Sequence, residues 1–131
     1  MKKISLKVIH RLLLQGVLNE EGKAGHTLSQ LNKMLKVTDK LAFTEEELKA
    51  INLRIVDTDD NGNKLQDTQY KWNSKDADGN DLDAGKEIEL SDEQNQLIKD
   101  LFKKKNDAKE FKLGDVKPML EIAAEIGFDV E

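Results

Sequence analysis

Three capping boxes do most to constrain how this chain folds, because each one marks the first turn of a helix. In a capping box, a Ser or Thr side chain accepts a hydrogen bond from the backbone N–H three residues later, and the Glu or Gln at that position bonds back. The three pairs are Thr27 with Gln30, Thr44 with Glu47, and Ser91 with Gln94. They predict helices over residues 28–36, 45–51 and 92–105.

Two further helices are predicted from single terminal signals. Ser5 and Asp115 are placed as N-caps, and Gly16 and Gly127 are placed to end the helices that these residues open. The predicted helices cover residues 6–15 and 116–126. Helical spacing also predicts that Leu28, Leu31 and Leu35 make one face of the helix at residues 28–36.

After the third helix the apolar pattern changes to a period of two, which is typical of strands. Residues 52–57 and 68–73 carry β-branched and aromatic side chains, and Ile88 and Leu90 alternate with glutamates in residues 86–90. The predicted fold class is therefore α+β. It has three N-terminal helices, a small antiparallel sheet of about three strands, and two C-terminal helices.

Aromatic side chains in the second predicted strand indicate which of its faces is buried. Tyr70 and Trp72 alternate along the strand, so both are expected on one face of the sheet. We expect Trp72 to pack under a helix.

Length and composition agree with a single α+β domain spanning residues 1–131. Charged residues make up 36% of the chain and hydrophobic residues 37%, and no apolar run approaches the roughly 20 residues of a membrane span. We therefore expect no membrane partner. The chain has no cysteine, which excludes disulfides, thiolate nucleophiles and zinc–thiolate sites and fits an intracellular protein.

The segment between the first two predicted strands permits two interpretations. Its letters match positions 1, 3, 5 and 6 of an EF-hand calcium loop, at Asp57, Asp59, Asn61 and Gly62. Position 12 should be a carboxylate, but Thr68 stands there, and the flanking residues favour strands over helices. Asn-Gly is also the strongest short-range hairpin signal. We interpret the segment as a hairpin and keep a calcium-binding module as an alternative.

Acidic residues are concentrated in the middle of the chain. Residues 45–93 contain fifteen Asp and Glu against six Lys and Arg. Three helices followed by a hairpin is also the order of a winged helix, so a winged-helix-like regulator is the first alternative. In that arrangement Glu45, Glu46 and Glu47 would face phosphate, which repels them. Duplex DNA is therefore not an expected partner.

The sequence offers no recognisable catalytic constellation. Its two histidines, His10 and His26, have no Ser or Asp partner at a recognisable spacing, and phosphate-binding, dinucleotide-binding and zinc-protease motifs are absent. We expect neither an enzyme nor a cofactor.

Several of these segments together resemble a group of small proteins encoded by phages and prophages. The resemblance covers most of the chain and is carried by "ISLKVIHRLLLQGVLNEEG", "FTEEELKAI", "YKWN" and "KEIELSDEQNQLIKDLFKKK". The chain departs from the group in its longer, more acidic hairpin and in its last segment, "GDVKPMLEIAAEIG". The resemblance implies a phage context and a small accessory protein, and it transfers no catalytic residue.

The sequence therefore predicts a non-enzymatic accessory protein of phage or prophage origin that binds another protein. The partner is expected to be a virion component, a host factor or a second copy of the chain, in the host cytoplasm or the virion. The expected binding residues are the acids Glu45, Glu46, Asp57, Asp59 and Asp60.

Overall fold

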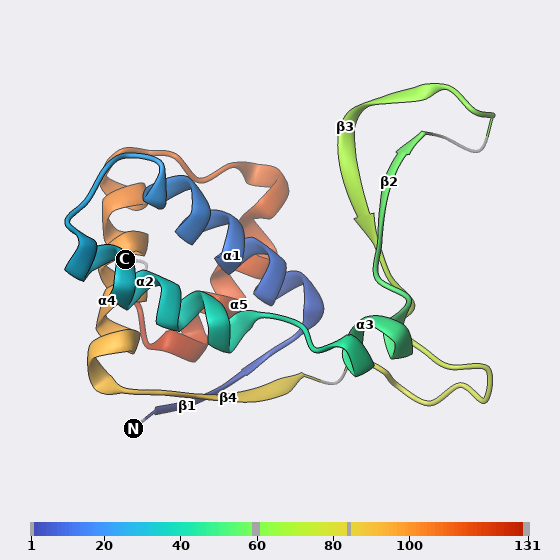
Figure 1. Ribbon diagram of the computed structural model, residues 1–131, viewed down its shortest axis with the longest axis horizontal. Coiled ribbons are helices and arrows are strands. Elements are labelled where there is room, and N and C mark those ends of the chain that lie inside the picture. The colour runs from blue at the N-terminus through green and yellow to red at the C-terminus, as the bar shows by residue number, and fades with distance from the viewer. Residues whose placement is uncertain (1, 59–60, 84, 130–131) are drawn as a thin grey trace. The chain divides into compact units, whose positions relative to one another are not determined.

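The computed structural model describes residues 2–58, 61–83 and 85–129, and helices and strands both contribute to it (Figure 1). The elements are β1 (Lys2–Leu6), α1 (Val8–Gly22), α2 (Leu28–Leu41), α3 (Glu45–Ile51), β2 (Arg54–Thr58), β3 (Lys64–Lys71), β4 (Lys86–Leu90), α4 (Asp92–Asp107), the 3-10 turn η1 (Leu113–Asp115) and α5 (Val116–Ile126). This mixture confirms the α+β class. The chain divides into two compact units, which are Met1–Ala42 with Gly85–Glu131 (unit 1) and Phe43–Ala84 (unit 2).

Unit 1 is built on the antiparallel pair β1–β4, in which Ile4 lies opposite Ile88. Apolar and polar residues alternate along both strands, so the apolar ones share a face. The buried side chains of that face are Ile4, Leu6, Ile88 and Leu90. The residues at 86–90 therefore form the predicted strand, but they pair with the start of the chain instead of with the hairpin.

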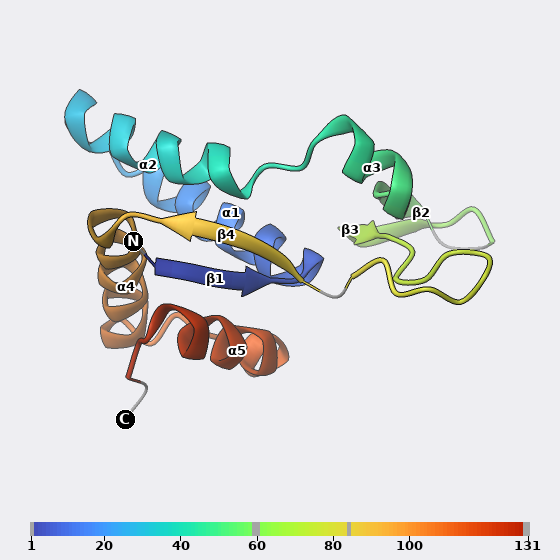
Figure 2. The same cartoon turned by 90° about the horizontal axis from the view of Figure 1, so that it is seen from below.

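Side chains from two helices close the outer edges of this two-stranded sheet. Lys40 of α2 donates a hydrogen bond to the backbone oxygen of Glu89 at 2.8 Å. At the other edge, the backbone N–H of Ser5 donates to the carboxylate of Glu125 in α5 at 2.9 Å. Figure 2 shows α2 running beside β4 and α5 beside β1. Because exposed strand edges recruit further strands, these two bonds help to limit the sheet to two strands.

The N-terminal helix differs from its prediction at both ends. Ser5 lies inside β1 and Lys7 is the N-cap of α1, so the predicted cap was wrong. The helix also continues through Gly16 to Gly22. A glycine costs a helix interior roughly 1 kcal/mol relative to alanine. Burial of Leu14 and Leu18 against the core offsets that cost.

The leucine face predicted on α2 is only partly covered, with Leu31 packed against the core. Met34, Val37 and Leu41 are buried, whereas Leu28 is 85% exposed and Leu35 is 55% exposed. The three leucines do share one side of the helix, but the sheet and α1 contact α2 further around its surface. Local spacing identifies an apolar stripe, and the neighbouring elements decide how much of it is covered.

The C-terminal helices pack through aromatic contacts. The Phe102 ring of α4 makes edge contacts with Phe111 at 5.5 Å and with Phe128 at 5.8 Å between ring centroids. Gly127 ends α5 with φ at +76°, a left-handed conformation that glycine adopts without strain, as predicted. The capping boxes of α2, α3 and α4 are likewise confirmed.

Unit 2 consists of α3, the hairpin β2–β3 and the loop that follows. The strands β2 and β3 pair antiparallel, which confirms the predicted hairpin, and Gly62 in its connection has φ at +83°. The predicted sheet of about three strands is therefore two separate sheets of two strands among the described residues. Trp72 follows the last residue of β3 and is half-buried, whereas Tyr70 is 51% exposed.

Candidate partner-binding surface

The first turn of α3 supplies two of the five predicted binding residues. Thr44 accepts a hydrogen bond from the backbone N–H of Glu47 at 3.1 Å, and the Glu47 carboxylate accepts one from the N–H of Thr44 at 3.0 Å. Glu47 is therefore part of the cap, while Glu45 and Glu46 are exposed to solvent. Carboxylates in a first turn are favoured by the positive end of the helix dipole. The fold thus holds two acids on the surface at little cost.

The hairpin supplies a third predicted residue, Asp57, which is exposed in β2. It lies where the pairing between β2 and β3 is irregular, between Val56 opposite Gln69 and Thr58 opposite Lys64. Such irregularities bend a strand and re-aim its side chains. The predicted binding residues therefore come from two separate elements of unit 2. The remaining two, Asp59 and Asp60, lie outside the described residues.

The hairpin also exposes an apolar pair that sequence reasoning did not include in the site. Ile55 and Tyr70 lie directly opposite each other in the β2–β3 register. Their exposed fractions are 63% and 51%. Residues opposite each other in an antiparallel pair project from the same face, so the two side chains form one exposed patch. Tyrosine is enriched at protein interfaces because its ring is apolar and its hydroxyl can hydrogen-bond.

A second acidic segment follows the hairpin, and Asp76 organises it. Its carboxylate accepts hydrogen bonds from the backbone N–H groups of Asp78 and Asn80, each at 2.9 Å, and from the Asn80 side chain at 3.2 Å. The bonds from Asn80, backbone first and side chain second, hold the pKa of Asp76 below its ordinary value. This carboxylate is engaged within the loop, and Asp78 remains exposed beside it.

The two units differ strongly in charge. Unit 2 contains eleven Asp and Glu against five Lys and Arg, whereas unit 1 contains fifteen against sixteen. Unit 2 also has no histidine or cysteine. An acidic surface with an exposed apolar pair is complementary to a surface that is basic and partly apolar.

Within residues 2–58, 61–83 and 85–129, no three His, Asp or Glu side chains come together so as to hold a metal ion. Over the same residues, no helix combines the length and the apolar character needed to cross a membrane. No protein family, curated protein or solved structure matches this chain.

Proposed function

We propose that this chain is a non-enzymatic accessory protein that binds another protein through the surface of unit 2. The phage or prophage origin is part of the proposal and rests on the resemblance described above. The partner is a virion component, a host factor or a second copy of the chain, encountered in the host cytoplasm or the virion.

The observation that carries the proposal is the exposed pair Ile55–Tyr70 on a unit with a net charge of −6. A few apolar or aromatic anchors supply most of the affinity of a typical interface, and surrounding charges steer the encounter. The partner surface that fits is an apolar patch surrounded by Lys and Arg. Phosphate is anionic and is repelled by the same surface.

The winged-helix alternative gains no support from how the chain divides. A winged helix packs its helices and its hairpin into one unit. Here α1 and α2 belong to unit 1, whereas α3 and the hairpin belong to unit 2. The first turn of α3, which would approach DNA, presents Glu45 and Glu46.

The test compares two triple variants that remove the same charge. The first is Glu45→Gln, Glu46→Gln, Asp57→Asn in unit 2, and the control is Glu20→Gln, Asp39→Asn, Asp107→Asn at exposed positions of unit 1. Neutral amides are used because a lysine in the first turn of α3 would oppose the helix dipole. Partner captured from infected and uninfected host lysate is quantified for both variants and the wild type.

We expect the unit 2 variant to capture less partner and to associate with it roughly tenfold more slowly at low salt, because exposed charges accelerate encounter. The control should behave as the wild type does. A gel shift on random duplex DNA should show no more than weak contact, at about 10⁻⁴–10⁻⁶ M. Equal capture by both variants at all salt concentrations, or a tight sequence-dependent gel shift, would overturn the proposal.

A further inference from the structure

A groove of about 380 Å³ lies between α2 and α4 in unit 1. Its volume falls within the roughly 300–1,000 Å³ of typical ligand sites. Met34, Leu97 and Leu101 form an apolar floor that is continuous with the hydrophobic core. An apolar group seated there would be removed from water, and the flexible Met34 side chain can adjust to its shape.

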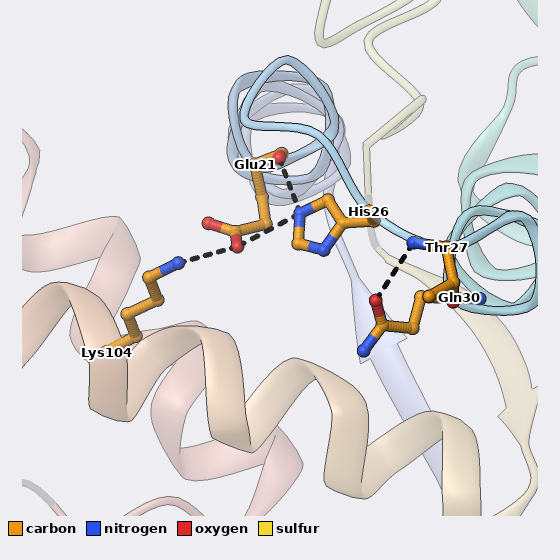
Figure 3. Close-up of polar contacts among 5 residues, drawn as sticks. All are labelled: Glu21, His26, Thr27, Gln30 and Lys104. Atoms are coloured by element: carbon orange, nitrogen blue, oxygen red, sulfur yellow. Dashed lines mark hydrogen bonds and ion pairs between the residues drawn. The ribbon is translucent and has the colours of Figure 1, made fainter.

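Two lysines are paired with carboxylates that line this groove. The Lys33 ammonium of α2 lies 2.9 Å from a carboxylate oxygen of Glu93 in α4. This contact holds the pKa of Glu93 below its ordinary value. Lys104 of α4 lies 2.7 Å from a carboxylate oxygen of Glu21, which is near the end of α1 (Figure 3). An anionic ligand would have to displace one of these carboxylates.

His26 is held at the groove in a defined orientation. Its Nε2 lies 2.9 Å from the backbone oxygen of Glu21 and 3.3 Å from the Glu21 carboxylate. Figure 3 shows the ring held between Glu21 and the start of α2, where the N–H of Thr27 donates to Gln30 at 3.2 Å. Both neighbours of Nε2 are acceptors, so Nε2 carries the proton of the neutral ring. In that tautomer Nδ1 is the acceptor nitrogen of the ring.

Asp100 of α4 supplies a second acceptor to the same groove. Its carboxylate accepts a hydrogen bond from the Gln96 side chain at 2.9 Å. Among the described residues it has no cationic partner, in contrast to Glu21 and Glu93. The groove therefore combines an apolar floor with one unneutralised carboxylate and one imidazole acceptor.

We propose that this groove binds an ammonium or guanidinium group carried on an apolar chain. The chain lies on Met34, Leu97 and Leu101, and the cation donates hydrogen bonds to Asp100 and His26. The site is in unit 1, so it is independent of the protein-binding surface proposed for unit 2.

The first experiment follows backbone amide NMR shifts of the full chain during titration with three probes at low salt. Hexylammonium carries both the cation and the apolar chain, methylammonium lacks the chain, and hexanoate reverses the charge. We expect hexylammonium to shift amides of α2 and α4 and to bind at least about tenfold more tightly than either other probe. Its chain buries apolar surface that methylammonium lacks, and its ammonium makes charge-assisted hydrogen bonds that hexanoate cannot donate. A lysine side chain presents the same chemistry as a free amine. A capped Leu-Lys dipeptide is therefore titrated in parallel, to distinguish a peptide ligand from a small amine.

Matched substitutions identify the residues involved. Asp100→Asn should weaken hexylammonium binding roughly tenfold, as expected for the loss of a charged acceptor. Asp107→Asn, an exposed acid at the end of the same helix, should leave it unchanged. His26→Phe removes Nδ1 and should also weaken binding, while hexanoate binding stays the same. The proposal is overturned if hexanoate binds as tightly as hexylammonium, if no amide of α2 or α4 shifts, or if Asp100→Asn and Asp107→Asn behave alike.

Discussion

The Arg11 guanidinium of α1 donates a hydrogen bond from Nε to the backbone oxygen of Leu41 at 3.1 Å. A second bond joins its Nη2 to the backbone oxygen of Ala42 at 2.6 Å. Arg11 is 2% exposed. The last carbonyls of a helix have no partner within the helix and favour a positive charge. A buried arginine therefore closes the end of α2, and both of its bonds lie within unit 1.

Replacing Arg11 should destabilise the protein through these carbonyls. Arg11→Met keeps most of the side-chain volume but removes both hydrogen bonds from the charged guanidinium. The Leu41 oxygen keeps its bond from the Gln15 side chain at 2.8 Å, so the loss should lower the free energy of unfolding by about 1–3 kcal/mol. Urea denaturation followed by circular dichroism measures the change. Arg54→Met, at an exposed position of β2, is the control and should change stability by no more than about 0.5 kcal/mol. Equal midpoints for the two variants would show that the Arg11 bonds add nothing.

Unit 1 should fold without unit 2. Its hydrophobic core cluster is formed by residues before Phe43 and after Ala84, and none of them belongs to unit 2. We expect a chain in which residues 43–84 are replaced by a flexible Gly/Ser linker of about eight residues to unfold cooperatively on heating. The dispersed amide spectrum of unit 1 should be retained, and binding of the captured partner should be lost. A collapsed state without fixed side-chain packing would refute this modular division.

The exposed hairpin pair should contribute more to binding than to stability. A cross-strand pair contributes about 0.2–1 kcal/mol, so the double variant Ile55→Ser, Tyr70→Ser should unfold at nearly the wild-type denaturant concentration. Loss of two interface anchors should weaken partner affinity at least about tenfold. The matched control is Leu28→Ser, Leu35→Ser, which removes two similarly exposed apolar residues from α2. Calorimetric titration with the captured partner should separate the two variants; equal affinities would exclude the hairpin face.

Acid should loosen the loop that Asp76 organises. Because hydrogen bonds from Asn80 lower the pKa of this carboxyl in the folded loop, its contribution is fully present above the ordinary Asp pKa of 3.8. The contribution is lost as the pH falls through the lower folded value. Amide shifts of Asp78 and Asn80 should therefore change with a midpoint below pH 3.8. In Asp76→Asn the Asn80 amide should lose this transition, and a wild-type midpoint at or above the ordinary value would contradict the hydrogen-bond assignment.

Part of the candidate surface could be predicted from local sequence. Glu45 and Glu46 follow directly from the Thr44 cap, which places them in the first turn of a helix whatever the rest of the chain does. Ile55 and Tyr70 could not be assigned in this way. Both residue types favour strands whether covered or exposed, and their exposure depends on whether another layer packs on that face. The one sequence signal of their exposure was that few apolar residues surround the hairpin in the chain.

The sequence by itself determined where α2, α3 and α4 begin, that β2 and β3 form a hairpin, and where α5 ends. Each depends on contacts between near neighbours, such as Thr27 with Gln30 or the left-handed turn at Gly127. The tertiary structure decided that β4 pairs with β1, which side of α2 is covered, and where the groove lined by His26 and Asp100 forms. Strand propensity specifies a strand but not its partner. Partner choice depends on which apolar faces are buried together and which edges are closed, here by Lys40 and Glu125.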